Sequence, residues 1–190
     1  MQQYFVDTPL YVGEDYIFTK EQAHHAKTVV RLDHEKVRLV YQGQAYFAEA
    51  YTKDKEFIAH VYEKDDSIHE SLCDVTLAVA LIRREKFELV LQKATELGVK
   101  RIVPFESSRC VVRSKKEKAD KLKIRWNAIV QEASEQCKRN CIPEVRDIIP
   151  FKQLNQYLSQ ANYACYENSY GKASFLSECA KDKQSITVVI

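Results

Sequence analysis

The sequence predicts an α/β protein in which a small β-barrel precedes a larger domain built on a parallel β-sheet. The first seventy residues contain short apolar or alternating segments and one helical segment, a combination typical of small barrels. From residue 75 onward, apolar runs alternate with amphipathic segments, which indicates a sheet covered by helices on both faces. Residues 63–71 are polar and separate the two patterns. We therefore expect domains at 1–71 and 72–190.

Four segments predict the strands of the barrel. Residues 2–6 are a short apolar and aromatic run. Residues 37–41 and 45–51 flank a turn in which Gly43 supplies the unusual backbone angles of a hairpin. Residues 57–62 alternate apolar and polar side chains, as a half-buried strand does.

One helix is expected within the barrel domain. Thr19 and Gln22 have the spacing of a capping box, in which each side chain bonds the backbone of the other residue. Apolar residues then recur at helical spacing at Ala23, Ala26, Val29 and Val30.

The second domain begins with a strand at residues 75–82, which are almost continuously apolar. A helical stripe from Phe87 to Leu97 follows, and Gly98 is a typical helix stop. Residues 101–105 predict the next strand, and residues 122–137 a long amphipathic helix. Further strands are expected at 145–149, 163–166 and 186–190.

Composition argues against a secreted or membrane protein. The apolar runs are far shorter than the roughly 20 residues of a membrane span, and the N-terminus lacks the pattern of a signal peptide. We expect a cytoplasmic location. Six cysteines show no metal-ligand spacing beyond the pair Cys137 and Cys141, so we expect thiols packed as small apolar groups and no metal site.

The net charge of +2 conceals an asymmetry between the two halves. Residues 1–70 carry 8 Lys and Arg against 13 Asp and Glu, a balance of −5, whereas residues 71–190 carry 21 against 14, a balance of +7. Residues 109–125 alone hold eight basic and two acidic side chains. This excess suits a polyanion such as RNA, although a solvated surface segment is the alternative reading.

Polar residues are also concentrated where parallel strands are expected to end. The loops 83–86, 106–110 and 167–171 follow three such strands. On the long helix, a polar stripe borders the apolar face, and a surface ladder of ion pairs is favoured over an interface network. No P-loop, nucleophile elbow or dinucleotide fingerprint is present, so the catalytic residues stay unknown. The polar stripe on the long helix consists of Arg125, Glu132, Gln136 and Arg139.

Four segments resemble one known family. Residues 85–99 (EKFELVLQKATELGV) match its signature E-K-x-x-x-x-x-Q-K-x-x-E-L-G-V. Residues 102–110, residues 125–139 with Pro143, and residues 25–32 also match, in order and across nearly the whole chain. The chain is therefore similar to the RsmE family of ribosomal RNA methyltransferases.

The resemblance implies methylation of a uridine base of 16S ribosomal RNA at N3, with S-adenosylmethionine as cofactor. It further implies a PUA-like barrel, a SPOUT methyltransferase domain with a trefoil knot, and a homodimer that acts in ribosome biogenesis. A helix carrying Lys86, Gln92, Lys93 and Glu96 would lie close to the cofactor half. The RNA-binding residues would be Arg31, Lys86, Arg109, Arg113, Arg125 and Arg139, and Glu167 and Asn168 would contact the cofactor.

Two departures from the family pattern carry expectations. Gln3 stands where the family often has an arginine near the RNA, which puts a role for that position in question. The family continues beyond a strand like 186–190 into a glycine-rich cofactor segment, whereas this sequence stops at Ile190. We therefore expect these 190 residues alone to bind S-adenosylmethionine weakly or not at all, and to be inactive.

Two alternatives remain open at this point. The barrel and the basic region could bind RNA or assist ribosome assembly without chemistry. The chain could also be a SPOUT methyltransferase with another RNA target.

Overall fold

The structure, a computed structural model, describes residues 1–110, 116–166, 178 and 180–190, and it divides the chain into two units. The first unit comprises Met1–His69 and Glu135–Cys141, and the second Glu70–Ser134 and Ile142–Ile190. The expected boundary between residues 71 and 72 falls two residues beyond the observed one. Segment 135–141 groups with the first unit because polar groups in its last residues bond to that unit, as described below.

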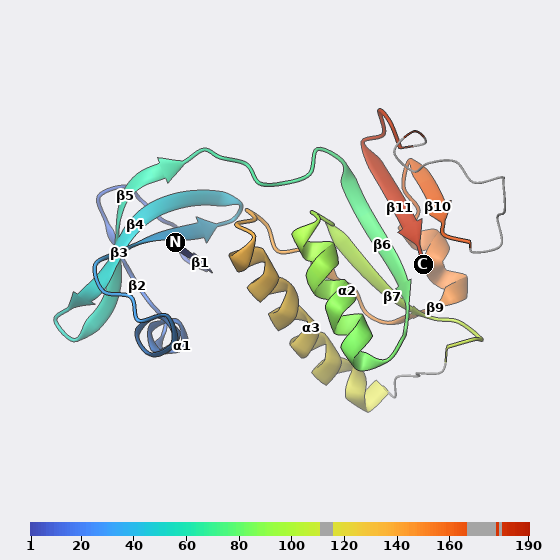
Figure 1. Cartoon of the computed structure of the whole chain (residues 1–190), viewed down its shortest axis with the longest axis horizontal. Helices are drawn as coiled ribbons and strands as arrows, with labels where there is room; N and C mark the ends of the chain where they lie inside the picture. Colours follow the sequence, from blue (N-terminus) through green and yellow to red (C-terminus); the bar gives the residue numbers. More distant parts are fainter. Residues whose placement is uncertain (111–115, 167–177, 179) are drawn as a thin grey trace. The chain divides into compact units, whose positions relative to one another are not determined.

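The first unit is a curved five-stranded sheet (Figure 1). β1 (Gln2–Phe5) pairs in parallel with β3 (Glu35–Tyr41). The remaining neighbours pair antiparallel, in the order β3, β4 (Gln44–Lys53), β5 (Glu56–Asp65) and β2 (Asp15–Ile17). The four predicted strands are confirmed. β2 was not predicted, since three residues are too few to show an alternating pattern.

Two local features of this unit follow directly from the sequence. Gln42 and Gly43 both have positive φ angles, 47° and 85°, as a tight hairpin turn requires. The Thr19–Gln22 capping box is formed and begins α1 (Lys20–His24). The predicted helix then widens into the π-helical turn η1 (His25–Val30), a change that the apolar spacing does not reveal.

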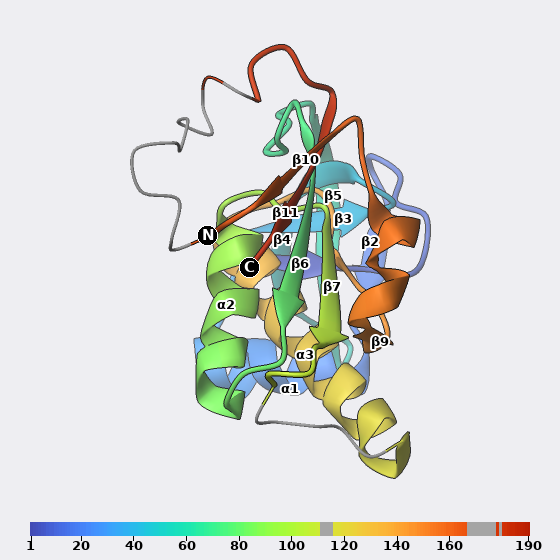
Figure 2. The same cartoon turned by 90° about the vertical axis from the view of Figure 1, so that its right-hand side faces the viewer.

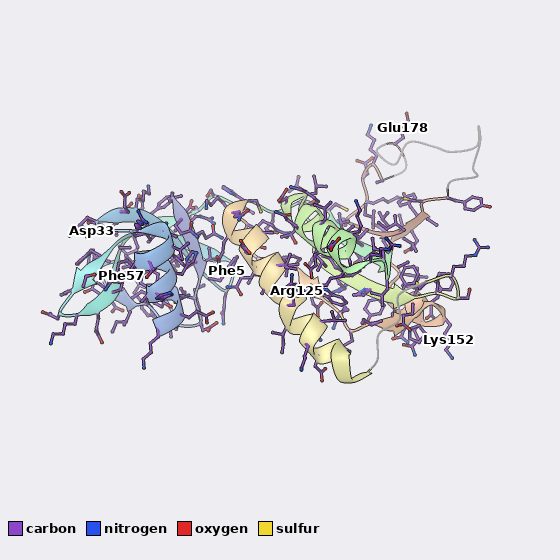
Figure 3. The ribbon with its side chains drawn as sticks, turned by 60° about the horizontal axis from the view of Figure 1, so that its bottom comes forward. Phe5, Asp33, Phe57, Arg125, Lys152 and Glu178 are labelled. Carbon is purple, nitrogen blue, oxygen red and sulfur yellow. The ribbon has the colours of Figure 1, made fainter. Side chains whose placement is uncertain are left out.

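An aromatic cluster forms the centre of the first unit. Phe18 packs against Tyr4 and Phe57, with ring centroids 5.2 and 5.1 Å apart. All three side chains are buried, and each contributes roughly 1.5–3 kcal/mol through removal of apolar surface from water. Phe57 is labelled in Figure 3.

The second unit is a parallel sheet, as predicted. Its order is β10 (Ala161–Ala164), β11 (Ser185–Val189), β6 (Asp74–Ala80), β7 (Arg101–Glu106) and β8 (Glu144–Val145). All of these neighbours pair in parallel, and β11 lies inside the sheet between β10 and β6.

The expected strand at 145–149 is divided in two, β8 and β9 (Ile149–Pro150), which both pair with β7. Pro104 explains the gap. The Ile102 carbonyl accepts from the Arg146 N–H (2.9 Å). The backbone N–H and C=O groups of the even-numbered residues of β7 therefore point toward the edge that pairs with β8 and β9. Pro104 is one of these even-numbered residues, and it has no N–H to donate toward that edge. Its missing hydrogen bond interrupts the pairing with β7 between β8 and β9.

Helices cover both faces of the parallel sheet (Figure 2). α2 (Arg84–Glu96) and α3 (Lys116–Gln136) pack on one face, where the Phe87 and Trp126 rings lie 4.6 Å apart. The short 3₁₀ helix η2 (Phe151–Tyr157) packs on the other face through Leu154. Within the described part of the chain, no helix is long and apolar enough to cross a bilayer.

Candidate functional site

A cavity of about 350 Å³ opens at the edge of the parallel sheet where β6 and β7 end. Figure 2 shows the arrowheads of these two strands side by side. The Leu81 N–H donates to the Phe105 carbonyl (2.9 Å), which fixes the start of one loop. The Cys110 N–H donates to the Ser107 carbonyl (3.2 Å), which closes the turn after β7. The cavity is lined by Ala80, Leu81, Ile82, Arg83, Ser107, Arg109 and Cys110.

Three cationic side chains stand at this edge. Arg83 precedes the first turn of α2, Lys86 lies in that turn, and Arg109 lies in the turn after β7. All three are exposed, and none makes a side-chain hydrogen bond or an ion pair with the residues that the structure describes. Two residues predicted to bind RNA, Lys86 and Arg109, are thus brought to one edge of the sheet.

Arg125 has a different environment on α3 (Figure 3). Its guanidinium binds the Glu88 carboxylate of α2 through Nε and Nη2, at 2.5 and 2.8 Å. Arg84 Nε donates to the same carboxylate (2.9 Å). Hydrogen bonds from Arg125, and then from Arg84, hold the pKa of Glu88 at about 2. Arg125 therefore links two helices, and its predicted contact with RNA stays a prediction.

Arg31 ends the π-helical turn in the first unit. Its backbone is left-handed (φ 61°, ψ 45°), an uncommon conformation for an arginine, and its N–H donates to the Ala26 carbonyl. The side chain is exposed and makes no hydrogen bond or ion pair with the residues that the structure describes. The geometry leaves its guanidinium available to a ligand.

Arg139 is not part of the predicted helical stripe, because α3 ends at Gln136 and Lys138 adopts a left-handed φ of 64°. The expectation of one continuous polar stripe was wrong in this respect. The Arg139 side chain is only 3% exposed, and its carbonyl accepts from Gln3 Nε2 (2.8 Å). We infer a structural role for Arg139.

A buried polar network, not anticipated from the sequence, surrounds Arg38. This residue is 1% exposed, and its Nε donates to Asp65 (2.7 Å). Its Nη1 donates to Gln3 Oε1 (2.7 Å) and its Nη2 to Asn140 (3.3 Å). Gln3 stands where the family often has an arginine, and the structure shows what it does there. Its side chain is fully buried and joins Arg38 to the Arg139 carbonyl. The available signal was one arginine within the apolar run of β3.

Three predicted site residues lie outside the described residues: Arg113, Glu167 and Asn168. Among the described residues, no group of three or more metal-ligating side chains is assembled. The cysteines described, namely Cys73, Cys110, Cys137, Cys141 and Cys165, are free thiols.

Comparison with known proteins decides the family. Residues 69–190 match the family model of the RNA methyltransferase domain. A ribosomal RNA small subunit methyltransferase E of Bacillus subtilis is 32% identical over 179 residues, which cover 89% of this chain and 69% of that protein. The chain belongs to this family of RNA methyltransferases.

Other members support the assignment. The methyltransferase E of Mesomycoplasma hyopneumoniae is 33% identical over 73% of this chain, and the match spans 60% of its own length. A crystal structure of a methyltransferase E from Neisseria gonorrhoeae, solved with S-adenosyl methionine bound, is 27% identical. It covers 100% of this chain and 79% of its own, with a TM-score of 0.84. The α/β fold class, a PUA-like domain followed by a SPOUT domain, agrees with this family likeness.

Proposed function

We propose that this protein transfers a methyl group from S-adenosylmethionine to N3 of a uridine in small-subunit ribosomal RNA. The observation that carries the proposal is the 32% identity to a small-subunit methyltransferase E along 89% of the chain. The choice of N3 rests on the sequence motifs shared with the RsmE family. A homodimer and a cytoplasmic location, both predicted from the resemblance and the composition, belong to the same proposal.

The chemistry requires alignment more than covalent assistance. A sulfonium supplies an electrophilic methyl group, and the protein must hold the attacking nitrogen in line with it. Uridine N3 carries a proton that has to be removed, and a cation near O2 or O4 stabilises the resulting negative charge. Lys86 and Arg31 are exposed cations that can hold phosphate or uracil oxygens. Arg139, which the family resemblance places among the RNA-binding residues, is buried and is better suited to supporting the fold.

The sheet also offers an edge suited to the cofactor. Open α/β sheets bind ligands beyond the carboxyl ends of their strands. β10, β11 and β6 are parallel neighbours that end at one such edge, where the Cys165 N–H donates to the Val189 carbonyl (3.0 Å). Glu167 and Asn168 follow β10 in the sequence after two intervening residues and are our candidates for holding the cofactor.

The test is the ribosomal RNA itself. Deletion of the gene in its host should remove 3-methyluridine from small-subunit RNA, as measured by mass spectrometry of the nucleosides, and complementation should restore it. Loss of a different methylated nucleoside would reassign the target base. Unchanged nucleosides together with impaired subunit assembly would favour the non-catalytic alternative.

A further inference from the structure

The cavity at the ends of β6 and β7 combines an apolar interior with a cationic rim. Leu81 is buried, Ile82 is 41% exposed at the mouth, and Ala80 and Cys110 are half-buried. Arg83 and Arg109 reach the cavity from its two loops. An apolar slot of this kind accepts the flat face of a ring, and a few polar groups then orient it.

Among the described residues, no carboxylate pairs with the two arginines at the rim. Arg84, next to Arg83 in sequence, binds Glu88, and Arg125 binds the same carboxylate. Arg83 and Arg109 have no such partner among the residues described. Two guanidinium groups without carboxylate partners beside an apolar slot fit a ligand that has a ring and adjacent anionic groups.

We propose that this cavity receives the uracil base of the RNA substrate, while Arg83 and Arg109 bind the phosphates on either side of its nucleotide. The inference rests on the proposed function and names the base-binding part of that site. Enzymes that modify a base in folded RNA must take it out of the stack, and an apolar pocket offsets part of the cost of unstacking.

Charge distinguishes this ligand from the cofactor. S-adenosylmethionine bears a sulfonium, an ammonium and a carboxylate, so it is a net cation at neutral pH. Two arginines that have no carboxylate partner among the described residues repel a net cation and attract a phosphodiester. The cofactor's adenine ring is therefore the less suitable occupant.

The experiment uses the full 190-residue chain and a short single-stranded RNA with one 4-thiouridine among adenosines. Irradiation cross-links the thiobase to the residues that it touches, and mass spectrometry identifies the peptide. We expect cross-links within residues 80–83 or 107–110. Cross-links confined to other parts of the chain would overturn the proposal.

Variants separate the base slot from the phosphate contacts. Ile82→Trp fills the mouth of the cavity and should abolish the preference for the uridine RNA over the same RNA with an abasic nucleotide. Arg83→Gln and Arg109→Gln should each weaken binding of both RNAs and lower the slope of log K against log salt by about 1. Arg101→Gln, at the opposite end of β7 and paired with Glu144, is the matched control and should change neither property.

The outcomes are distinct from those of the gene deletion. Equal losses in Arg83→Gln and Arg101→Gln would contradict a specific site, provided that circular dichroism shows both variants folded. Displacement of the cross-link by S-adenosylmethionine alone would assign the cavity to the cofactor and overturn the proposal. The cross-links could fall in the cavity while deletion of the gene leaves 3-methyluridine in place. The cavity would then still be the base-binding site, and uridine N3 would be rejected as the target of methylation.

Discussion

At the scale of single residues, Arg38 shows how a buried charge is made tolerable. Its guanidinium bonds to Asp65, Gln3, Asn140 and the Lys138 carbonyl, so little of its hydrogen-bonding capacity is lost on burial. Burial acts to raise the pKa of Asp65, but hydrogen bonds from Ser67 and Arg38 outweigh it and hold the pKa at about 2. Asn140 extends the network to the Gly43 and Ser67 carbonyls.

Removal of the carboxylate should therefore be costly. Asp65→Asn leaves the buried Arg38 without its counter-ion, and we expect the free energy of unfolding of the first unit to fall by roughly 3–5 kcal/mol. Hydrogen–deuterium exchange of peptides from β3 and β5 across a urea series measures this loss locally.

A surface pair provides the control for this variant. Asp15 binds Lys53 and His60 in a more exposed position, and Asp15→Asn should cost below about 1 kcal/mol. Similar losses in the two variants would show that the Arg38 network contributes no more than a surface ion pair. The double variant Arg38→Met with Asp65→Leu should recover much of the loss, because no unpaired charge remains.

At the scale of elements, α2 and α3 are joined by two kinds of contact. The apolar one is buried around Phe87, Trp126 and Val130. The ionic one joins Glu88 to Arg125 across the two helices at their outer surface. Such a pair is individually weak, but it holds the first turns of α2 in a fixed relation to α3, and α2 begins at the cavity.

This ionic contact predicts a pH dependence. The pKa of Glu88 is lowered from 4.5 to about 2 in the folded protein, so its contribution to stability is complete above pH 4.5 and is lost as the pH falls toward 2. Stability of the wild type should therefore decline more steeply in that window than stability of Glu88→Gln. Fluorescence of Trp126, the only tryptophan, reports unfolding of this unit. Parallel declines in the two proteins would argue that Glu88 is not a paired carboxylate.

At the scale of the whole molecule, charge is divided unevenly between the amino-terminal and carboxyl-terminal parts of the sequence. Residues 1–70 are acidic overall at −5, so simple electrostatic attraction cannot carry RNA binding by that part. We propose that individual cations such as Arg31, which lies at the end of the π-helical turn, bind RNA there. In the same proposal, the positive excess of residues 71–190 provides the less selective attraction to RNA.

RNA affinity should depend on single exposed cations in both parts of the sequence. Arg31→Gln and Lys86→Gln should each weaken binding of small-subunit RNA and lower the salt slope by about 1, as loss of one phosphate contact predicts. Arg139→Gln should mainly reduce stability, since that side chain is buried. Filter binding over a salt series, with the exposed residue change Lys55→Gln as control, measures the slopes. A larger effect of Arg139→Gln than of Arg31→Gln in folded protein would reverse the assigned roles.

The sequence by itself determined most of the strands and helices along the chain, the capping box, the hairpin turn and the parallel second sheet, but it did not reveal the short strand β2. These depend on local spacing and on apolar periodicity, which neighbouring residues specify. The motifs of the sequence also identified the family. Local patterns did not reveal the π-helical turn or the division of β8 from β9. The latter depends on which side of β7 Pro104 faces.

Only the tertiary structure decided which polar residues are free and which are paired. The sequence does not distinguish three exposed arginines, Arg83, Arg109 and Arg125. Only Arg125 of these three has a carboxylate partner in the described residues, Glu88, which lies 37 positions away. Arg38 and Asn140 are separated by 102 positions and meet in one buried network. Side-chain partners at such separations are set by the packing of whole elements, and that information is absent from the spacing of residues along the chain.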